Sequence, residues 1–178
     1  PRPITPDVAG IVGDGDGHLV IVYSGNLGEG NSLYAVYSDD GGASWSDPAL
    51  IYSTFVLDKK PFDFQLLRGD SGRIYLAWNV TDKAGDNVMG YFSKLDDVTS
   101  RTWTEPLPID NNIGLGIANT TLFEFKDRLF LFYNNGLAGQ VPPVIWFRSS
   151  TDGGSTFDQP IRPFPDHIGR NGPPAFAV

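Results

Sequence analysis

Three polar side chains recur at a constant spacing along the chain. Asp7, Asp63 and Asn119 stand at equal intervals, and each begins a segment rich in apolar residues. Carboxylates and amides suit sugar hydroxyls, because they accept or donate hydrogen bonds in a defined plane. We therefore take these three residues as candidate ligand contacts. The alternative is that they satisfy backbone amides where strands begin.

Three further residues could join them. Asp82 and Asp86 are the carboxylates of the segment 79–87, which we expect to be a loop at the same end of the fold. Trp78 could stack against a sugar ring if it faces the centre of the fold. No catalytic set emerges, and the absence of a His/Cys cluster or a Gly-rich phosphate loop predicts no metal site and no cofactor.

The elements that would position these residues are short apolar runs with a repeat of about 55 residues. Four runs in each repeat, separated by Gly, Asp and Pro, predict four antiparallel strands and almost no helix. The second run of each repeat is apolar on both faces, which predicts a central strand. The expected strands are 7–12, 18–23, 33–38 and 49–52; 63–67, 73–78, 88–93 and 107–109; and 119–123, 128–133, 144–149 and 160–162.

Such a repeat is typical of a β-propeller blade, so we expect an all-β fold of four-stranded antiparallel blades. The single domain 1–178 would hold three complete blades, at about 7–55, 61–110 and 117–165, with 171–178 starting a further strand. Three blades cannot close a ring. The chain is thus either half of a six-bladed ring, completed by a second copy in a homodimer, or part of a longer protein whose other blades are missing here.

An eight-residue pattern, Ser-x-Asp-x-Gly-x-Ser/Thr-aromatic, occurs in the first repeat and again in the third. Its residues are Ser38, Asp40, Gly42 and Trp45, and again Ser150, Asp152, Gly154 and Phe157. The pattern resembles the Asp-box, or BNR repeat, of sialidases and related β-propellers. The resemblance implies a structural turn between the third and fourth strands of a blade, away from the active face. Its Asp would accept backbone N–H bonds, and its aromatic residue would tuck under the blade as local core.

The chain departs from the sialidases that it resembles. That family implies an Arg-Ile-Pro start, three arginines for the substrate carboxylate, an Asp acid/base, and a Tyr nucleophile with Glu. Arg73 and Arg128 begin second strands at the wrong end, and Arg68 lies in a hairpin turn. The loops between second and third strands contain no arginine. Sialidase chemistry is therefore not supported by these residues.

Composition narrows the classes of partner. The formal charge of −8 argues against nucleic acid or an anionic membrane surface. No apolar run is long enough to span a bilayer, and the absence of Cys excludes disulfides and thiolate metal sites.

The sequence leaves three functions open. The first is a carbohydrate-binding, sialidase-like propeller that recognises a glycan or oligosaccharide at its central face and self-associates. The second is a fragment of a sialidase-like glycoside hydrolase whose catalytic residues lie partly in missing blades. The third is a protein-interaction propeller. The resemblance also favours a secreted or extracytoplasmic location, and whether the chain is an enzyme stays open.

Overall fold

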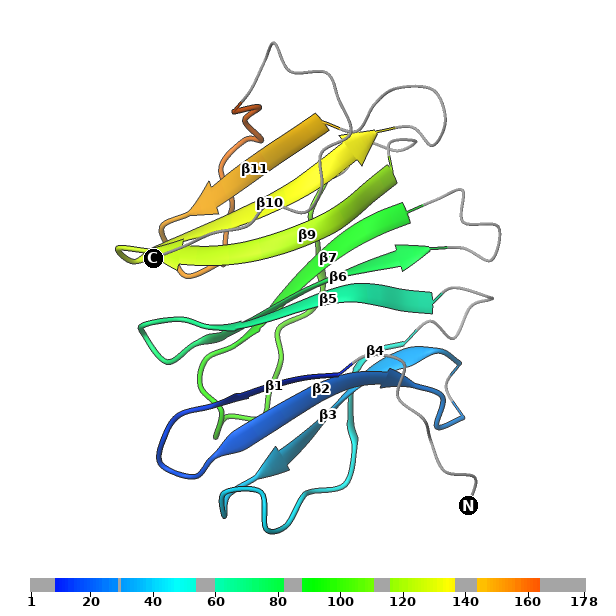
Figure 1. The fold of residues 1–178 in the computed structure, drawn as a ribbon, viewed down its shortest axis with the longest axis vertical. Helices are drawn as coiled ribbons and strands as arrows, with labels where there is room; N and C mark the ends of the chain where they lie inside the picture. Colours follow the sequence, from blue (N-terminus) through cyan, green and yellow to red (C-terminus); the bar gives the residue numbers. More distant parts are fainter. Residues whose placement is uncertain are drawn as a thin grey trace.

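The structure, a computed structural model, describes residues 9–28, 30–53, 60–81, 88–110, 116–136 and 144–163. These residues form eleven strands in three antiparallel sheets and contain no helix. The all-β prediction is therefore confirmed. Each sheet is a meander in which consecutive strands pair, and we call each sheet a blade (Figure 1). The proposed strand start at 171–178 lies outside the described residues.

Blade 1 has the predicted four strands in the order β1-β2-β3-β4. They are β1 (Ala9–Gly13), β2 (Leu19–Gly25), β3 (Ser32–Ser38) and β4 (Ala49–Tyr52). Blade 2 repeats this order with a shorter last strand. Its strands are β5 (Lys60–Arg68), β6 (Ile74–Thr81), β7 (Val88–Leu95) and β8 (Leu107–Pro108).

Blade 3 has three strands, in the order β9-β10-β11. They are β9 (Gly116–Phe125), β10 (Arg128–Gly136) and β11 (Val144–Ser150). The fourth strand expected at 160–162 is reduced to one bridge, in which Ile161 pairs with Phe147 through both backbone hydrogen bonds. Pro160, which has no N–H to donate, and Pro163 flank this short segment and limit further pairing.

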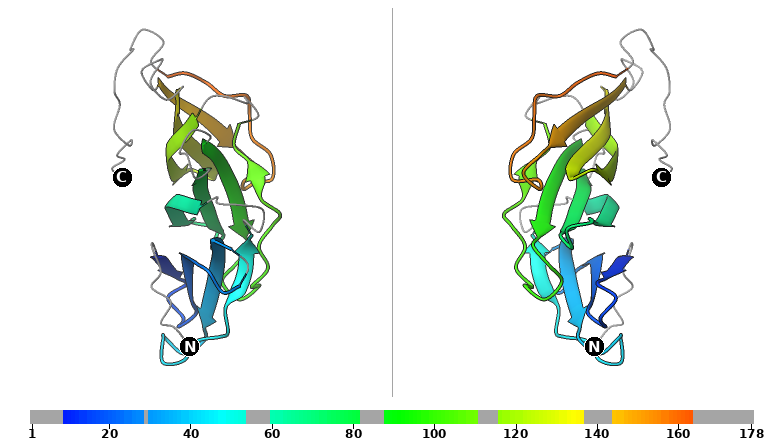
Figure 2. Two further views of the ribbon diagram at one scale, coloured as in Figure 1. Left: turned by 90° about the vertical axis from the view of Figure 1, so that its right-hand side faces the viewer. Right: turned by 90° about the vertical axis from the view of Figure 1, so that its left-hand side faces the viewer.

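The three blades stack face to face in chain order, with blade 2 in the middle (Figures 1 and 2). The alternation of side chains along β6 explains this stacking. Ile74, Leu76 and Trp78 point into a core shared with blade 1, whereas Tyr75 and Ala77 point into a core shared with blade 3. The prediction that second strands are apolar on both faces is thus confirmed for β6. Since each face buries its apolar side chains, the hydrophobic effect holds the stack together.

Candidate functional site

The two Ser-x-Asp turns lie at one end of the sheets and are closed by hydrogen bonds within each turn. Ser38 Oγ donates to Asp40 Oδ1 (2.8 Å) and accepts from the Gly42 N–H (2.9 Å). The Asp40 carboxylate accepts from Ser44 twice, from its N–H at 2.8 Å and from its hydroxyl at 2.6 Å. The polar side chains of the motif are therefore engaged in shaping the turn.

The second turn reproduces the first almost bond for bond. Ser150 Oγ donates to Asp152 Oδ1 (2.7 Å) and accepts from the Gly154 N–H (2.8 Å). Thr156 donates to Asp152 from its N–H (2.9 Å) and from its hydroxyl (2.6 Å). Gly154 has φ 80°, and a Cβ there would lie 2.6 Å from Phe92 Cζ, so only glycine fits.

The two motif aromatics differ from each other. Phe157 packs edge-on against Phe92, with ring centroids 5.1 Å apart, and joins the core between blades 2 and 3. Trp45 is 38% exposed and donates from Nε1 to the Gly42 carbonyl at 3.1 Å. The expectation that the aromatic residue of the motif packs into the local core is therefore confirmed for Phe157. It is wrong for Trp45, whose indole lies over its own turn.

These hydrogen bonds keep both turn carboxylates ionised. Donation from the Ser44 hydroxyl and N–H, together with Ser38, lowers the pKa of Asp40 from its ordinary 3.8 to about 2. Donation from Thr156 and Ser150 lowers the pKa of Asp152 as well. A carboxylate held ionised with its acceptor sites occupied is a poor general acid, so the geometry assigns both residues to the turn.

We expect this arrangement to make stability depend on pH. The folded pKa of Asp40 lies below the ordinary value of 3.8, so its stabilisation is present above pH 3.8 and is lost as the pH falls through about 2. Asp40→Asn should lower the Tm at pH 7 and flatten the fall of Tm between pH 4 and pH 2. Thermal unfolding followed by circular dichroism measures both. Asp16→Asn, in the exposed β1–β2 turn, is the control, and an Asp40→Asn profile parallel to wild type would contradict the assignment.

The opposite end of the sheets carries two irregular positions. Asp63 (φ 54°) and Asn119 (φ 53°) have left-handed backbone conformations that non-glycine residues rarely adopt. Each lies at a register shift, where two residues of the first strand face one residue of the second. These are β-bulges, a feature that re-aims side chains and is common beside functional sites. Asp63 and Asn119 thus lie inside β5 and β9, and not at strand starts as predicted.

A hydrogen-bonded chain of side chains runs from the first bulge to blade 3. Asn79 Nδ2 donates to Asp63 Oδ2 at 2.9 Å, and Asn79 Oδ1 accepts from Thr120 Oγ1 at 3.1 Å. Asn79 and Thr120 are buried, whereas Asp63 is half-buried. The network therefore fixes a partly accessible carboxylate beside the seam between blades 2 and 3.

Sequence reasoning missed Asn79 and Thr120, although a signal for the first was present. Ser24, Asn79 and Asn134 occupy the same position in successive repeats, each directly after the last aromatic of a second strand, and all three are buried. A polar residue repeated at the end of an apolar strand indicates an equivalent buried polar position in each blade. Of the other predicted contacts, Asp7, Asp82 and Asp86 lie outside the described residues.

The structure does not support Trp78 as a residue that stacks against a sugar ring. Its side chain is fully buried between blades 1 and 2, stacked on Tyr91 (centroids 5.7 Å apart) and tilted against Tyr52 (5.4 Å). An indole enclosed in this way has no free face for a sugar ring. The alternation of side chains along β6 explains this burial. Every second residue faces blade 1, so Trp78 points into the same core as Ile74 and Leu76.

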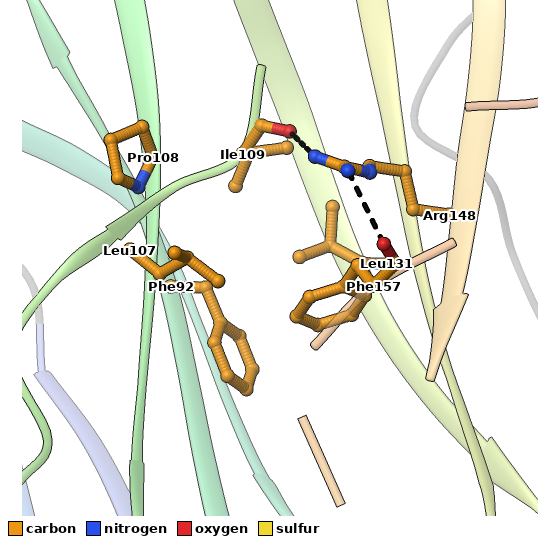
Figure 3. A pocket seen from close by; sticks show the side chains of 7 residues that line it. All are labelled: Phe92, Leu107, Pro108, Ile109, Leu131, Arg148 and Phe157. Carbon is orange, nitrogen blue, oxygen red and sulfur yellow. Dashed lines mark hydrogen bonds between the residues drawn. The ribbon is translucent and has the colours of Figure 1, made fainter. Parts of the chain in front are cut away.

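Two openings in the described part of the structure are not convincing ligand sites. A cavity of about 10 Å³ between blades 2 and 3 has room for one water molecule at most. Figure 3 shows Arg148 above it, donating to the carbonyls of Ile109 (2.7 Å) and Phe157 (3.4 Å). A larger opening at the turn end is lined by Glu124 and Asp152, whose carboxylates already accept hydrogen bonds from the protein.

Neither a metal cluster nor a membrane-spanning helix is found in the described ranges. They contain no group of three or more His, Cys, Asp or Glu side chains that could hold a metal ion. Within the same residues, no helix has the length and apolar character needed to cross a bilayer.

Solved structures with the same arrangement of sheets identify the fold. An ulvan lyase of polysaccharide lyase family PL25 aligns with a TM-score of 0.68 at 11% identity, over 90% of this chain and 44% of that one. The Hadza microbial sialidase Hz136 aligns at 0.60 with 16% identity, over 84% and 36%. The GH93 α-L-arabinofuranosidase of Fusarium graminearum, in complex with arabinobiose, aligns at 0.57 with 16% identity, over 86% and 47%.

The fold is a β-propeller. No family model and no curated protein sequence matches the chain, so the similarity is one of fold alone. The chain spans less than half the length of these three structures. The propeller prediction is therefore confirmed, and a membership in the Asp-box family stays an inference from the turn motif.

The hydrogen bond between Thr120 and Asn79 should contribute measurably to the stability of the fold. Thr120→Val keeps the shape of the side chain but removes the hydroxyl that donates to buried Asn79, leaving an unsatisfied acceptor. We expect a loss of about 1–3 kcal/mol in the free energy of unfolding, measured by urea denaturation. Thr120→Ser keeps the donor and should cost only about 1 kcal/mol for the lost methyl group. A valine variant as stable as wild type would rule out this hydrogen bond.

Proposed function

We propose that this chain binds a glycan at the bulge end of its sheets, around Asp63, Asn79, Asn119 and Thr120. The observation that carries the proposal is the pair of equivalent bulges, which hold a carboxylate and an amide in left-handed conformations at the same place in two blades. Strain of this kind persists only where the surrounding structure enforces it, and it concentrates at functional sites.

The chemistry of the site favours sugar hydroxyls. A half-buried carboxylate on Asp63 accepts hydrogen bonds, and the amide of Asn119 both donates and accepts. The neighbouring Asn79 holds Asp63 in place through a hydrogen bond of 2.9 Å, so the carboxylate is oriented before a ligand arrives. Preorganised, in-plane hydrogen bonding is what recognition of a polyhydroxylated ligand requires.

We propose an uncharged glycan in preference to a carboxylated one. Bidentate recognition of a carboxylate calls for arginine. The sequence segments 54–59, 82–87 and 137–143, which connect the strands at the bulge end, contain no arginine. Arg73 and Arg128, at the turn end, already pair with Asp96 (3.7 Å) and Asp158 (3.3 Å). The similar structures include an arabinofuranosidase with bound arabinobiose, so a neutral ligand has a precedent on this fold.

One observation favours a catalytic alternative. The similar structures are a sialidase, a lyase and an arabinofuranosidase, and each is more than twice as long as the part of it that this chain matches. The chain could therefore be part of a glycan-processing enzyme whose acid, base or nucleophile lies in further blades. Either version of the proposal includes a secreted or extracytoplasmic location, where polysaccharides are encountered.

A binding experiment with matched variants tests the proposal. An array of neutral and anionic glycans would identify a ligand for the wild-type chain, and isothermal titration would then give its affinity. Asp63→Gly removes the carboxylate while accepting the left-handed backbone, and should weaken binding at least about 10-fold, or about 1.4 kcal/mol. Asp70→Gly, in the hairpin turn at the opposite end, should leave affinity unchanged.

Three results would count against the proposal. A wild-type chain that binds no glycan on the array would overturn it. Binding that Asp63→Gly leaves intact would place the site elsewhere. Selective binding of uronates or sialosides would contradict the choice of an uncharged ligand.

A further inference from the structure

Four Asp-Gly pairs lie in turns at the end of the sheets that carries the two Ser-x-Asp turns. They are Asp14–Gly15, Asp16–Gly17, Asp40–Gly41 and Asp152–Gly153. The peptide nitrogen after an aspartate can attack the side-chain carboxyl carbon, and glycine permits the approach because it has no Cβ. A C–N bond forms, one water molecule leaves, and a succinimide ring closes. Water then reopens the ring at either carbonyl, which gives aspartate or isoaspartate.

Three of the four carboxylates are held in place by hydrogen bonds. Asp14 Oδ1 accepts from the N–H groups of Asp16 (2.8 Å) and His18 (3.2 Å), and Asp14 Oδ2 lies 2.6 Å from His18 Nδ1. Asp40 and Asp152 each accept from two hydroxyl groups and one N–H group within their own turns. Each of these carboxylates must release such bonds before its carbon can reach the next peptide nitrogen.

The glycines of the two Ser-x-Asp turns are constrained as well. The Gly41 N–H donates to the Gly17 carbonyl at 2.9 Å, so the nitrogen that would attack is already engaged. Gly153 is buried, and its carbonyl accepts from Lys94 Nζ at 3.1 Å. Arg73 lies against the same glycine, since a Cβ built there would be 2.8 Å from Arg73 Nη1. Neither pair is therefore free to reach the geometry of ring closure.

Asp16–Gly17 differs from the other three pairs. Asp16 is exposed in the turn between β1 and β2, and its carboxylate accepts no hydrogen bond from any residue that the structure describes. Within the same residues, the Gly17 N–H donates to no acceptor. Both reacting groups, the carboxyl carbon and the following nitrogen, are thus unengaged and open to solvent.

We propose that Asp16–Gly17 is a site of spontaneous isoaspartate formation, and that hydrogen bonds protect the other three Asp-Gly pairs. The modification routes the main chain through the Asp16 side chain and so adds one carbon atom before Gly17. The Gly17 carbonyl accepts from the Gly41 N–H, a bond that joins this turn to the Ser-x-Asp turn of blade 1. A longer main chain disturbs that joint. The proposal is independent of the glycan site, which lies at the opposite end of the sheets.

Peptide mapping of the folded chain after prolonged incubation in neutral buffer tests the proposal. Electron-transfer fragmentation assigns isoaspartate to a position, and isoaspartate that arises from asparagine is counted separately because its mass increases. We expect at least about 10-fold more isoaspartate at Asp16 than at any of the other three pairs, since those must first break hydrogen bonds to a charged group. Asp16→Glu keeps the charge but would need a six-membered ring, and should abolish the modification there.

A second variant tests the protection by hydrogen bonds. Thr156→Val removes the hydroxyl that donates to Asp152 at 2.6 Å, and should raise isoaspartate at Asp152 while leaving Asp16 unchanged. Thr156→Ser keeps that donor and is the control. The incubated wild-type chain should also have a lower Tm than the fresh chain, a decline that Asp16→Glu should prevent. Isoaspartate spread evenly over the four pairs, or absent from Asp16, would overturn the proposal, and so would a valine variant with Asp152 unmodified.

Discussion

The structure depends on one constraint, which is that the middle sheet is apolar on both faces and is covered by a neighbouring sheet on each. Along β6, successive side chains enter alternate cores, Leu76 toward blade 1 and Tyr75 toward blade 3. Neither core exists without its neighbouring blade, so a single blade could not bury enough apolar surface to fold alone.

Under the proposed function, structural and ligand-binding roles separate along the strands. At one end, the turns around Asp40 and Asp152 use their polar side chains internally, and that closure leaves little for a ligand. At the other end, Asp63 and Asn119 adopt strained conformations at bulges, and Asp63 stays half-buried with a hydrogen-bond partner behind it. In such a scaffold the rigid turn end would hold the strands in place, and the bulge end would present polar side chains to a ligand.

The strands and turns could be predicted because their signals are local. Alternation of apolar residues and closely spaced turn residues determine them, whereas the contacts of the site depend on register and on neighbouring blades. The bulge at Asp63 appears only when β5 is paired with β6, and the Asn79–Thr120 bond joins two blades. A strand that is apolar on both sides does not reveal which way Trp78 points, and the pattern alone could not show that Trp45 stays outside the core.

The most direct test of the account is to map a bound glycan on the protein. Amide chemical shifts of the isotopically labelled chain would be followed while a glycan that binds is titrated in. The account predicts that the largest changes fall on Asp63, Asn79, Asn119 and Thr120, with the turns at Asp40 and Asp152 unmoved. Shifts concentrated at these turns would contradict a glycan site at the bulge end of the sheets.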